Sequence, residues 1–139
     1  MIIKVKSLSK VKRETWAIFS LYIRLRDCLK TTGTLEYGLC FTCGARLPFS
    51  RLQAGHFIPG RHSANLFSER GTNAQCPQCN VYLHGNPLEY RRKIIKLYGE
   101  EVDERLEKEA KQIKKFSIPE LEGIKLEYKK KIELLRENA

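Results

Sequence analysis

The chain has 139 residues, of which 42% are hydrophobic and 9% aromatic. This composition excludes a disordered protein and predicts one domain with a modest core and an appended helical part. The sequence shows no signal peptide and no apolar run long enough to cross a bilayer. We therefore expect a cytoplasmic protein with no membrane partner.

The formal net charge of +10 is unevenly distributed along the chain. Residues 1–30 hold eight lysines and arginines against two acids, residues 31–99 hold eight against three, and residues 100–139 hold ten against eleven. The net positive charge is therefore concentrated in residues 1–99. Such a concentration indicates a polyanionic partner, most economically nucleic acid, and a merely solubilising charge is the alternative.

The first predicted element is a helix over about residues 11–30, ended by Gly33 just past its last turn. Its apolar face recurs at three-to-four spacing through Ile18, Leu21, Leu25 and Cys28. Because Cys28 lies on this face and away from the other cysteines, we expect it to be a small buried residue.

Short strands and turns are predicted in the middle of the chain. A strand over residues 52–58 would carry His56 near its end, Pro59-Gly60 would form a turn, and residues 65–69 would be its antiparallel partner. A helix is then predicted from Cys76 through about residue 83, where Gly85-Asn86-Pro87 breaks it.

The C-terminal third is predicted to be helical, with helices over residues 88–98, 100–115 and about 118–137. Ser117 before Pro119-Glu120 is a typical helix start. The last helix carries an apolar stripe through Leu121, Ile124, Tyr128, Ile132 and Leu135. This stripe must be buried, either on the same chain or in a homodimer interface.

Two Cys-x-x-Cys pairs give the strongest chemical signal in the sequence. Two cysteines separated by two residues hold one side of a tetrahedral ion at the tip of a turn, and a second such pair completes the site. Disulfides are the alternative, but the odd cysteine count and the absence of a secretion signal disfavour them. We therefore predict a structural four-thiolate Zn²⁺ site with the ligands Cys40, Cys43, Cys76 and Cys79.

A cysteine pair, a strand carrying a histidine, and a second pair opening a helix resemble the ββα-metal core of His-Me finger, or HNH, nucleases. The whole chain resembles the phage NinG/Rap family of recombination nucleases and is similar to endonuclease VII-type junction resolvases. The motifs that carry the resemblance are Y-I-R-L-R-D from Tyr22, C-F-T-C-G from Cys40, A-G-H-F from Ala54, S-E-R from Ser68, Q-C-P-Q-C-N from Gln75 and G-N-P-L-E-Y-R from Gly85.

The resemblance implies an α+β fold with a small zinc-stabilised ββα-metal (HNH-like) core flanked by an N-terminal helix and C-terminal helices. The expected segments are a basic arm and helix (1–34), the nuclease core (35–98) and a C-terminal helical segment (99–139). It also implies a metal-dependent endonuclease acting on Holliday junctions or D-loops in the cytoplasm of a phage host. A homodimer is expected, because resolving a junction takes two nicks.

The resemblance also assigns roles to residues. His56 would be the general base, since a neutral imidazole can take a proton from water. Asn80 would offer its side-chain carbonyl to a catalytic Mg²⁺ or Mn²⁺. The chain departs from the family pattern at Gly55, where an acidic metal ligand is common, and at Gly71, where an asparagine is usual.

Other residues are candidates to complete the catalytic site. Asn73 lies two residues after Gly71 and is a candidate catalytic residue. His84 is a candidate cofactor ligand, because it follows Asn80 by four residues on the predicted helix and would share its face. Glu69 and Glu89 are weaker candidates for the same cation.

Backbone-phosphate contacts are expected from basic residues around this core, namely Arg61, Arg70, Arg91, Arg92 and Lys93. His62, beside Arg61, is expected to neighbour a phosphate or solvent. Three alternatives to a junction nuclease remain open: a non-catalytic zinc module that binds DNA, an HNH endonuclease acting on linear or single-stranded DNA, and an adaptor whose C-terminal helices bind a protein.

Overall fold

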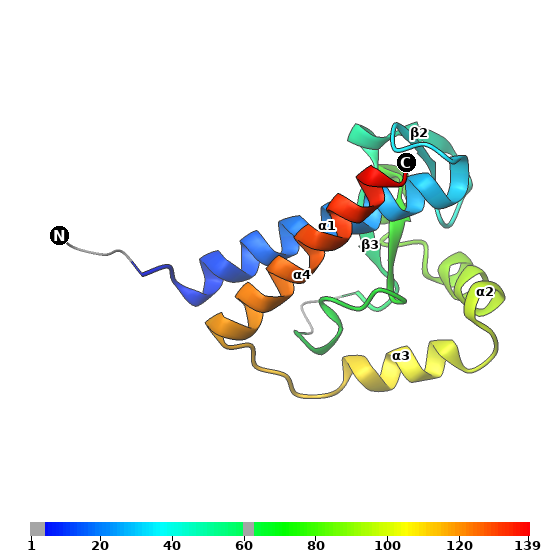
Figure 1. The fold of residues 1–139 in the computed structure, drawn as a ribbon. Coiled ribbons are helices and arrows are strands. Elements are labelled where there is room, and N and C mark those ends of the chain that lie inside the picture. The colour runs from blue at the N-terminus through cyan, green and yellow to red at the C-terminus, as the bar shows by residue number, and fades with distance from the viewer. Residues whose placement is uncertain (1–4, 60–62) are drawn as a thin grey trace.

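The computed structural model describes residues 5–59 and 63–139. The described chain is a mixture of helices and two small two-stranded sheets, with the first and last helices lying side by side (Figure 1). The predicted α+β class is therefore confirmed. Among the described helices, none is both long and apolar enough to cross a membrane.

The first helix, α1, spans Leu8–Thr32 and is longer at both ends than predicted. The hydroxyl of Ser7 caps its start by accepting a hydrogen bond from the backbone N–H of Lys10. Gly33 ends it in the left-handed conformation, at φ 78°, as its position after the last turn predicts. Cys28 is fully buried, as expected.

Two antiparallel ribbons follow α1. Strand β1 (Tyr37–Leu39) pairs with β2 (Arg46–Pro48), and β3 (Gln53–His56) pairs with β4 (Thr72–Gln75). The predicted strand over residues 65–69 is therefore wrong, since the partner of β3 begins at Thr72. Strand β4 was not predicted because its buried residues are mostly polar. A prediction based on the pattern of apolar residues assigns such a polar stretch to a turn.

The remaining helices differ in how well they match the prediction. A π-helix spans Gln78–Tyr82, and α2 spans Pro87–Tyr98 close to its predicted bounds. Helix α3 covers only Val102–Ala110, so the predicted helix over residues 100–115 is too long. Glu101 explains the late start, because its positive φ of 74° is incompatible with helical geometry. Helix α4 spans Ile118–Glu137, with Ser117 as its cap.

Helices α1 and α4 run in the same direction and share an aromatic core (Figure 1). The rings of Phe19 and Tyr128 meet edge-on with centroids 4.9 Å apart, and the Thr15 hydroxyl donates to the Leu121 carbonyl at 3.2 Å. Packing within the chain therefore accounts for the buried part of the apolar stripe on α4, which the sequence alone left open between this and a dimer interface.

Removing one side chain from this contact should destabilise the fold measurably. Leu121 is fully buried, so Leu121→Ala is expected to lower the free energy of unfolding by about 2–5 kcal/mol. Leu134 on the same helix is 56% exposed, so Leu134→Ala should change it by no more than about 0.5 kcal/mol. Urea unfolding followed by circular dichroism compares the two, and equal effects would contradict the packing of α4 on α1.

The end of α1 also holds the second ribbon in place. Arg26 donates to the carbonyl of Thr72 at 2.9 Å, while the Asp27 carboxylate accepts the backbone N–H of Ala74 at 2.7 Å. The two side chains pair with each other at 2.8 Å. The R-D pair of the Y-I-R-L-R-D motif thus fixes β4, and through it the residues that follow β4.

Candidate functional site

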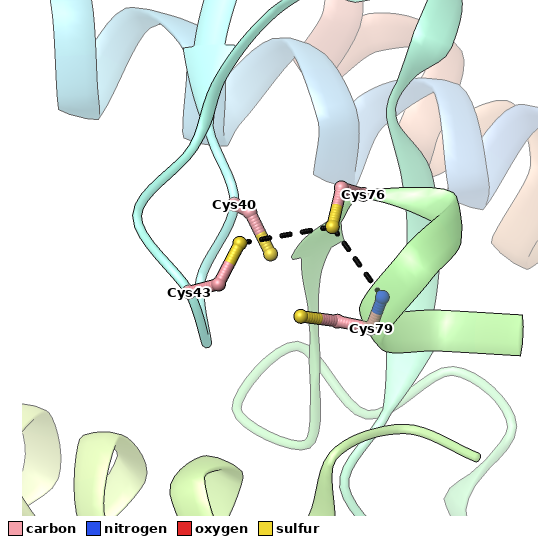
Figure 2. Close-up of side chains that lie close together, drawn as sticks. All are labelled: Cys40, Cys43, Cys76 and Cys79. Atoms are coloured by element: carbon pink, nitrogen blue, oxygen red, sulfur yellow. Dashed lines mark hydrogen bonds between the residues drawn. The ribbon is translucent and has the colours of Figure 1, made fainter. Parts of the chain in front are cut away.

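Four cysteines from two distant segments converge on one point (Figure 2). Their sulfur atoms all lie within 4.8 Å of one another, and the Sγ atoms of Cys43 and Cys76 are 3.7 Å apart. Four thiolates arranged tetrahedrally around Zn²⁺ at about 2.3 Å would be separated by about 3.8 Å. The cluster therefore has a geometry compatible with zinc. All five cysteines of the chain are unbridged.

Local structure explains why the sulfurs meet. The first pair lies in the turn between β1 and β2, where Gly44 takes a positive φ of 77° that other residues avoid. The second pair follows β4 directly, and the backbone N–H of Cys79 points at the Cys76 sulfur at 3.4 Å. Asn86 adds a side-chain N–H to the Cys79 sulfur at 3.6 Å. Donors of this kind stabilise thiolates and orient metal ligands.

Within the closely packed cluster, the pKa values of Cys40, Cys43 and Cys76 are shifted in different directions. Burial opposes ionisation of Cys40, but backbone N–H groups and the Thr42 hydroxyl outweigh it and lower the pKa of Cys40 to about 6. Burial and the neighbouring Cys40 sulfur raise the pKa of Cys43 and of Cys76. A divalent cation would remove this conflict, because it stabilises all four thiolates together.

His56 stands at the end of β3, with its ring held on two sides. The ring stacks on Trp16 of α1 with centroids 5.0 Å apart, and Nε2 lies 3.1 Å from the carbonyl oxygen of Leu66. Because a carbonyl only accepts, this hydrogen bond places the proton on Nε2, so in the neutral ring Nδ1 carries the lone pair. Burial lowers the pKa of His56, so the neutral ring is favoured at neutral pH.

Asn80 follows the second cysteine pair directly and is held beside β3. Its Nδ2 donates to the Gln53 side-chain oxygen at 2.8 Å. Its Oδ1 lies 2.7 Å from the point where a Cβ on Gly55 would sit. The structure thus brings Asn80 next to the residue that precedes His56, on the opposite face of the ribbon from the His56 ring.

Gln75 is a member of this site that the sequence analysis missed. It is fully buried, and its Nε2 donates to the Gly85 carbonyl at 2.9 Å and to the Thr42 hydroxyl at 3.1 Å. Its Oε1 has no hydrogen-bond partner among the described residues and would lie only 1.9 Å from a Cβ on Gly55. The sequence feature that could have indicated Gln75 is an uncharged hydrogen-bonding side chain directly before the second cysteine pair.

The helix after the second cysteine pair ends close to its predicted end near residue 83, but it is a π-helix and His84 lies beyond it. The π-helix stops at Tyr82, and His84, Gly85 and Asn86 form a turn in which all three have positive φ. His84 is exposed in this turn, so it does not share a helix face with Asn80. The argument from i, i+4 spacing fails because His84 lies beyond the helix end and its φ of 51° is not helical.

The weaker catalytic candidates are all engaged elsewhere. Asn73 is buried and donates to the Tyr90 hydroxyl at 3.1 Å, and Tyr90 in turn donates to the Gly55 carbonyl at 2.7 Å. The Glu69 carboxylate accepts hydrogen bonds from Tyr128 and Lys131 on α4. Glu89 pairs with Arg92 at 2.9 Å.

The predicted phosphate contacts also differ in their surroundings. Arg91 is ion-paired with two carboxylates of α3, and Arg92 is paired with Glu89. Arg70 is exposed and lies over the Tyr98 ring, 5.6 Å from its centroid. Lys93 has no carboxylate partner within the part of the chain that the structure describes. Arg61 and His62 lie outside the described residues.

Comparison with known proteins identifies the family. The profile described as "NinG: Bacteriophage Lambda NinG protein" matches residues 2–138, which is nearly the whole chain. The chain belongs to the NinG family. The predicted resemblance to NinG is thereby confirmed.

Two curated NinG relatives show how far the likeness extends. Protein ninG of Escherichia phage lambda is 33% identical over 98 residues, which cover 70% of this chain and 47% of that protein. Protein ninG of Escherichia phage 933W is 31% identical over 98 residues, covering 70% of this chain and 48% of that protein. The chain thus spans about half the length of the NinG proteins it matches. No solved structure matches it.

Proposed function

We propose that this chain is a zinc-stabilised, divalent-metal-dependent DNA endonuclease of the HNH type that cuts branched recombination intermediates. The observation that carries the proposal is the placement of His56. Burial favours its neutral ring, the Leu66 carbonyl fixes its Nε2–H, and it directly follows Gly55, whose Cβ position is approached by Asn80 Oδ1. Membership of the NinG family and the net charge of +10 are consistent with DNA as the substrate.

The proposed roles follow from the chemistry of phosphodiester hydrolysis. Nδ1 of His56 would take the proton of the attacking water, while the Leu66 carbonyl holds Nε2–H and fixes the ring. Stacking on Trp16 keeps the ring from rotating away, and burial lowers the pKa of His56 and so favours its neutral form. Asn80 would supply an oxygen ligand whose direction is set by Gln53. Zinc would be structural, because four thiolates leave it no open position.

Whether the site suits a catalytic cation depends on what replaces the acidic residue absent at Gly55. The Gly85 carbonyl can only accept, so it fixes the Gln75 amide with Nε2 toward Gly85 and the orphaned Oε1 toward Gly55. Asn80 Oδ1 approaches the same space. Two uncharged oxygens therefore converge where a side chain at residue 55 would stand, and oxygen donors suit Mg²⁺ and Mn²⁺. The residues fit such a cation, which would neutralise charge on the scissile phosphate.

A test of this ligand set is direct cation binding. Gln75→Met keeps the length of the side chain but removes the oxygen, so Mn²⁺ binding in the presence of uncut DNA should weaken by about 10–100-fold. Electron paramagnetic resonance of free Mn²⁺ measures this without relying on cleavage. The exposed Gln112→Met is the matched control and should bind as the wild type does. Unaltered Mn²⁺ affinity in Gln75→Met, with zinc retained, would remove Gln75 from the ligand set.

The proposed activity is tested by offering a four-way junction and a linear duplex of the same sequence with Mg²⁺, with Mn²⁺ and without either. We expect paired nicks near the branch that require the added cation, together with about one zinc per chain. Equal cutting of the linear duplex would favour a nuclease of broader substrate range. Tight binding without cleavage under every condition would leave a zinc-stabilised DNA-binding module. Mass measurement in the same buffer tests the expected homodimer.

A further inference from the structure

A cavity of about 410 Å³ lies between the end of α1, the first cysteine pair and α2. Its volume is within the range of about 300–1,000 Å³ typical of sites for single small molecules. Its lining includes three lysines, Lys30, Lys93 and Lys96, and three apolar side chains, Leu39, Phe41 and Leu97. The cavity therefore combines cationic groups with an apolar wall.

The three lysines have no carboxylate partner among the described residues, unlike the arginines beside them on α2. Arg91 and Arg92 lie on α2 together with Lys93 and Lys96, but carboxylates at 2.7 Å and 2.9 Å neutralise the two arginines. Within residues 5–59 and 63–139, no carboxylate lies within ion-pair distance of Lys30, Lys93 or Lys96. Three ammonium groups around one cavity repel one another, so an anion entering it would be stabilised.

The polar groups on the cavity floor are already satisfied. Asp27 accepts hydrogen bonds from Arg26 and from the backbone of Ala74, and Asn73 is bonded to Tyr90 and Arg26. A ligand would therefore meet charge at the rim and only apolar contact from Leu39, Phe41 and Leu97. Such a site favours a flat apolar ring attached to an anionic group, and it cannot read the hydrogen-bonding edge of that ring.

We propose that this cavity binds one unpaired nucleotide of a DNA strand, with the lysines on its phosphates and the base against the apolar wall. The proposal rests on the proposed function for its ligand class, DNA. It assigns a second contact site, separate from His56 and tolerant of any base. An unpaired nucleotide is available at a branch or bulge but not in a continuous duplex, so the cavity would contribute to substrate choice.

The distance to the proposed catalytic site is compatible with one DNA strand reaching both. Trp16 stacks on His56 and Asp27 lines the cavity, and both belong to α1. At 1.5 Å per residue, this length of helix places the cavity on the order of 16 Å from His56 along α1. A single strand covers this distance with roughly five phosphates, spaced about 3.4 Å apart. The distance is also shorter than one helical turn of duplex DNA, which is about 34 Å.

The experiment compares affinity for two duplexes of the same sequence, one continuous and one with a single extra nucleotide, by fluorescence anisotropy without Mg²⁺ or Mn²⁺. The wild type is expected to bind the bulged duplex about tenfold more tightly. This preference should fall to within about twofold when the cavity lysines are neutralised together, in the triple variant Lys30→Gln, Lys93→Gln and Lys96→Gln. The slope of log affinity against log salt should also decrease by roughly 2, because about 0.7 is lost per single-strand phosphate contact.

A matched control separates the cavity from net charge. Neutralising three exposed lysines elsewhere lowers the charge equally but should keep the tenfold preference, in the variant Lys108→Gln, Lys129→Gln and Lys130→Gln. A bulge that lacks its base should lose the preference in the wild type, because the apolar wall then has nothing to contact. Equal losses in both triple variants, or equal binding of both duplexes by the wild type, would overturn the proposal.

Two further outcomes would also overturn it. If the cavity lysines serve only to offset the negative charge of a four-thiolate zinc centre, their triple variant would lose zinc, which metal analysis detects. If polyglutamate of equal charge displaces the bulged duplex as well as DNA does, the cavity takes acidic peptides. Cleavage of junctions by a wild type without any bulge preference would reject this site and leave the nuclease proposal standing, whereas failure to bind either duplex would reject both.

Discussion

His56→Ala is expected to slow DNA cleavage by about 10²–10⁴-fold, because general-base catalysis typically contributes that much. The measurement is a single-turnover rate on a four-way junction with saturating Mg²⁺ or Mn²⁺. Zinc content and junction binding should be retained, since His56 lies outside the four-cysteine cluster and its ring is only partly buried.

A second variant tests whether His84, and not His56, is the general base. His84 is exposed in the turn after the π-helix, so His84→Ala should slow cleavage far less than His56→Ala does. A larger loss in His84→Ala would reverse the assignment. Full activity in His56→Ala would refute the general-base role outright.

The pH dependence of cleavage gives an independent reading of the same residue. Burial lowers the pKa of His56, so the base stays neutral at pH values where an ordinary histidine, with a pKa of about 6.5, is already protonated. The acidic limb of the kcat/KM profile should therefore lie below about pH 6.5. Because the folded state disfavours protonation, His56 should also reduce folding stability as the pH falls below the unfolded-state pKa.

Loss of a cysteine ligand should have the largest effect on folding. Structural zinc contributes about 10–16 kcal/mol in small zinc-binding peptides, which equals or exceeds the whole stability of a typical domain. Cys76→Ser is therefore expected to lose zinc and the fold around both cysteine pairs. Metal analysis and thermal unfolding measure the two effects, and strong chelators should reproduce them in the wild type.

The fifth cysteine supplies the matched control. Cys28 is fully buried in α1 and lies outside the cluster, so Cys28→Ala should keep one zinc per chain and a cooperative unfolding transition. Loss of zinc in both variants would show that general destabilisation, and not ligation, explains the result. Retention of zinc in Cys76→Ser would contradict a four-thiolate site.

Sequence patterns predicted the parts of this molecule that depend on local signals. Helices α1, α2 and α4 were marked by caps and periodicity, as Ser117 and Gly33 show. The cysteine pairs were found because their spacing is itself the geometric requirement for a metal site. Such features depend on a few residues that are close together in the sequence, so they can be predicted from a single sequence.

The parts that were missed depend on contacts between distant residues. Strand β4 is held by Arg26 and Asp27 of α1, which no local pattern reveals. Gln75 matters because Gly55 lies opposite its oxygen across the ribbon, so its role appears only when the register of β3 and β4 is known. Likewise, the backbone conformation at His84 overrides the helical spacing on which its assignment rested.

The parallel pairing of α1 and α4 has a consequence for how the protein is made. Phe19 and Ile23 emerge from the ribosome early, yet Tyr128, which covers them, is added only near the end of synthesis. Until then the nascent chain exposes an aromatic surface that invites association with other chains. We therefore expect chains interrupted near Phe116 to aggregate during translation instead of accumulating as a smaller working protein.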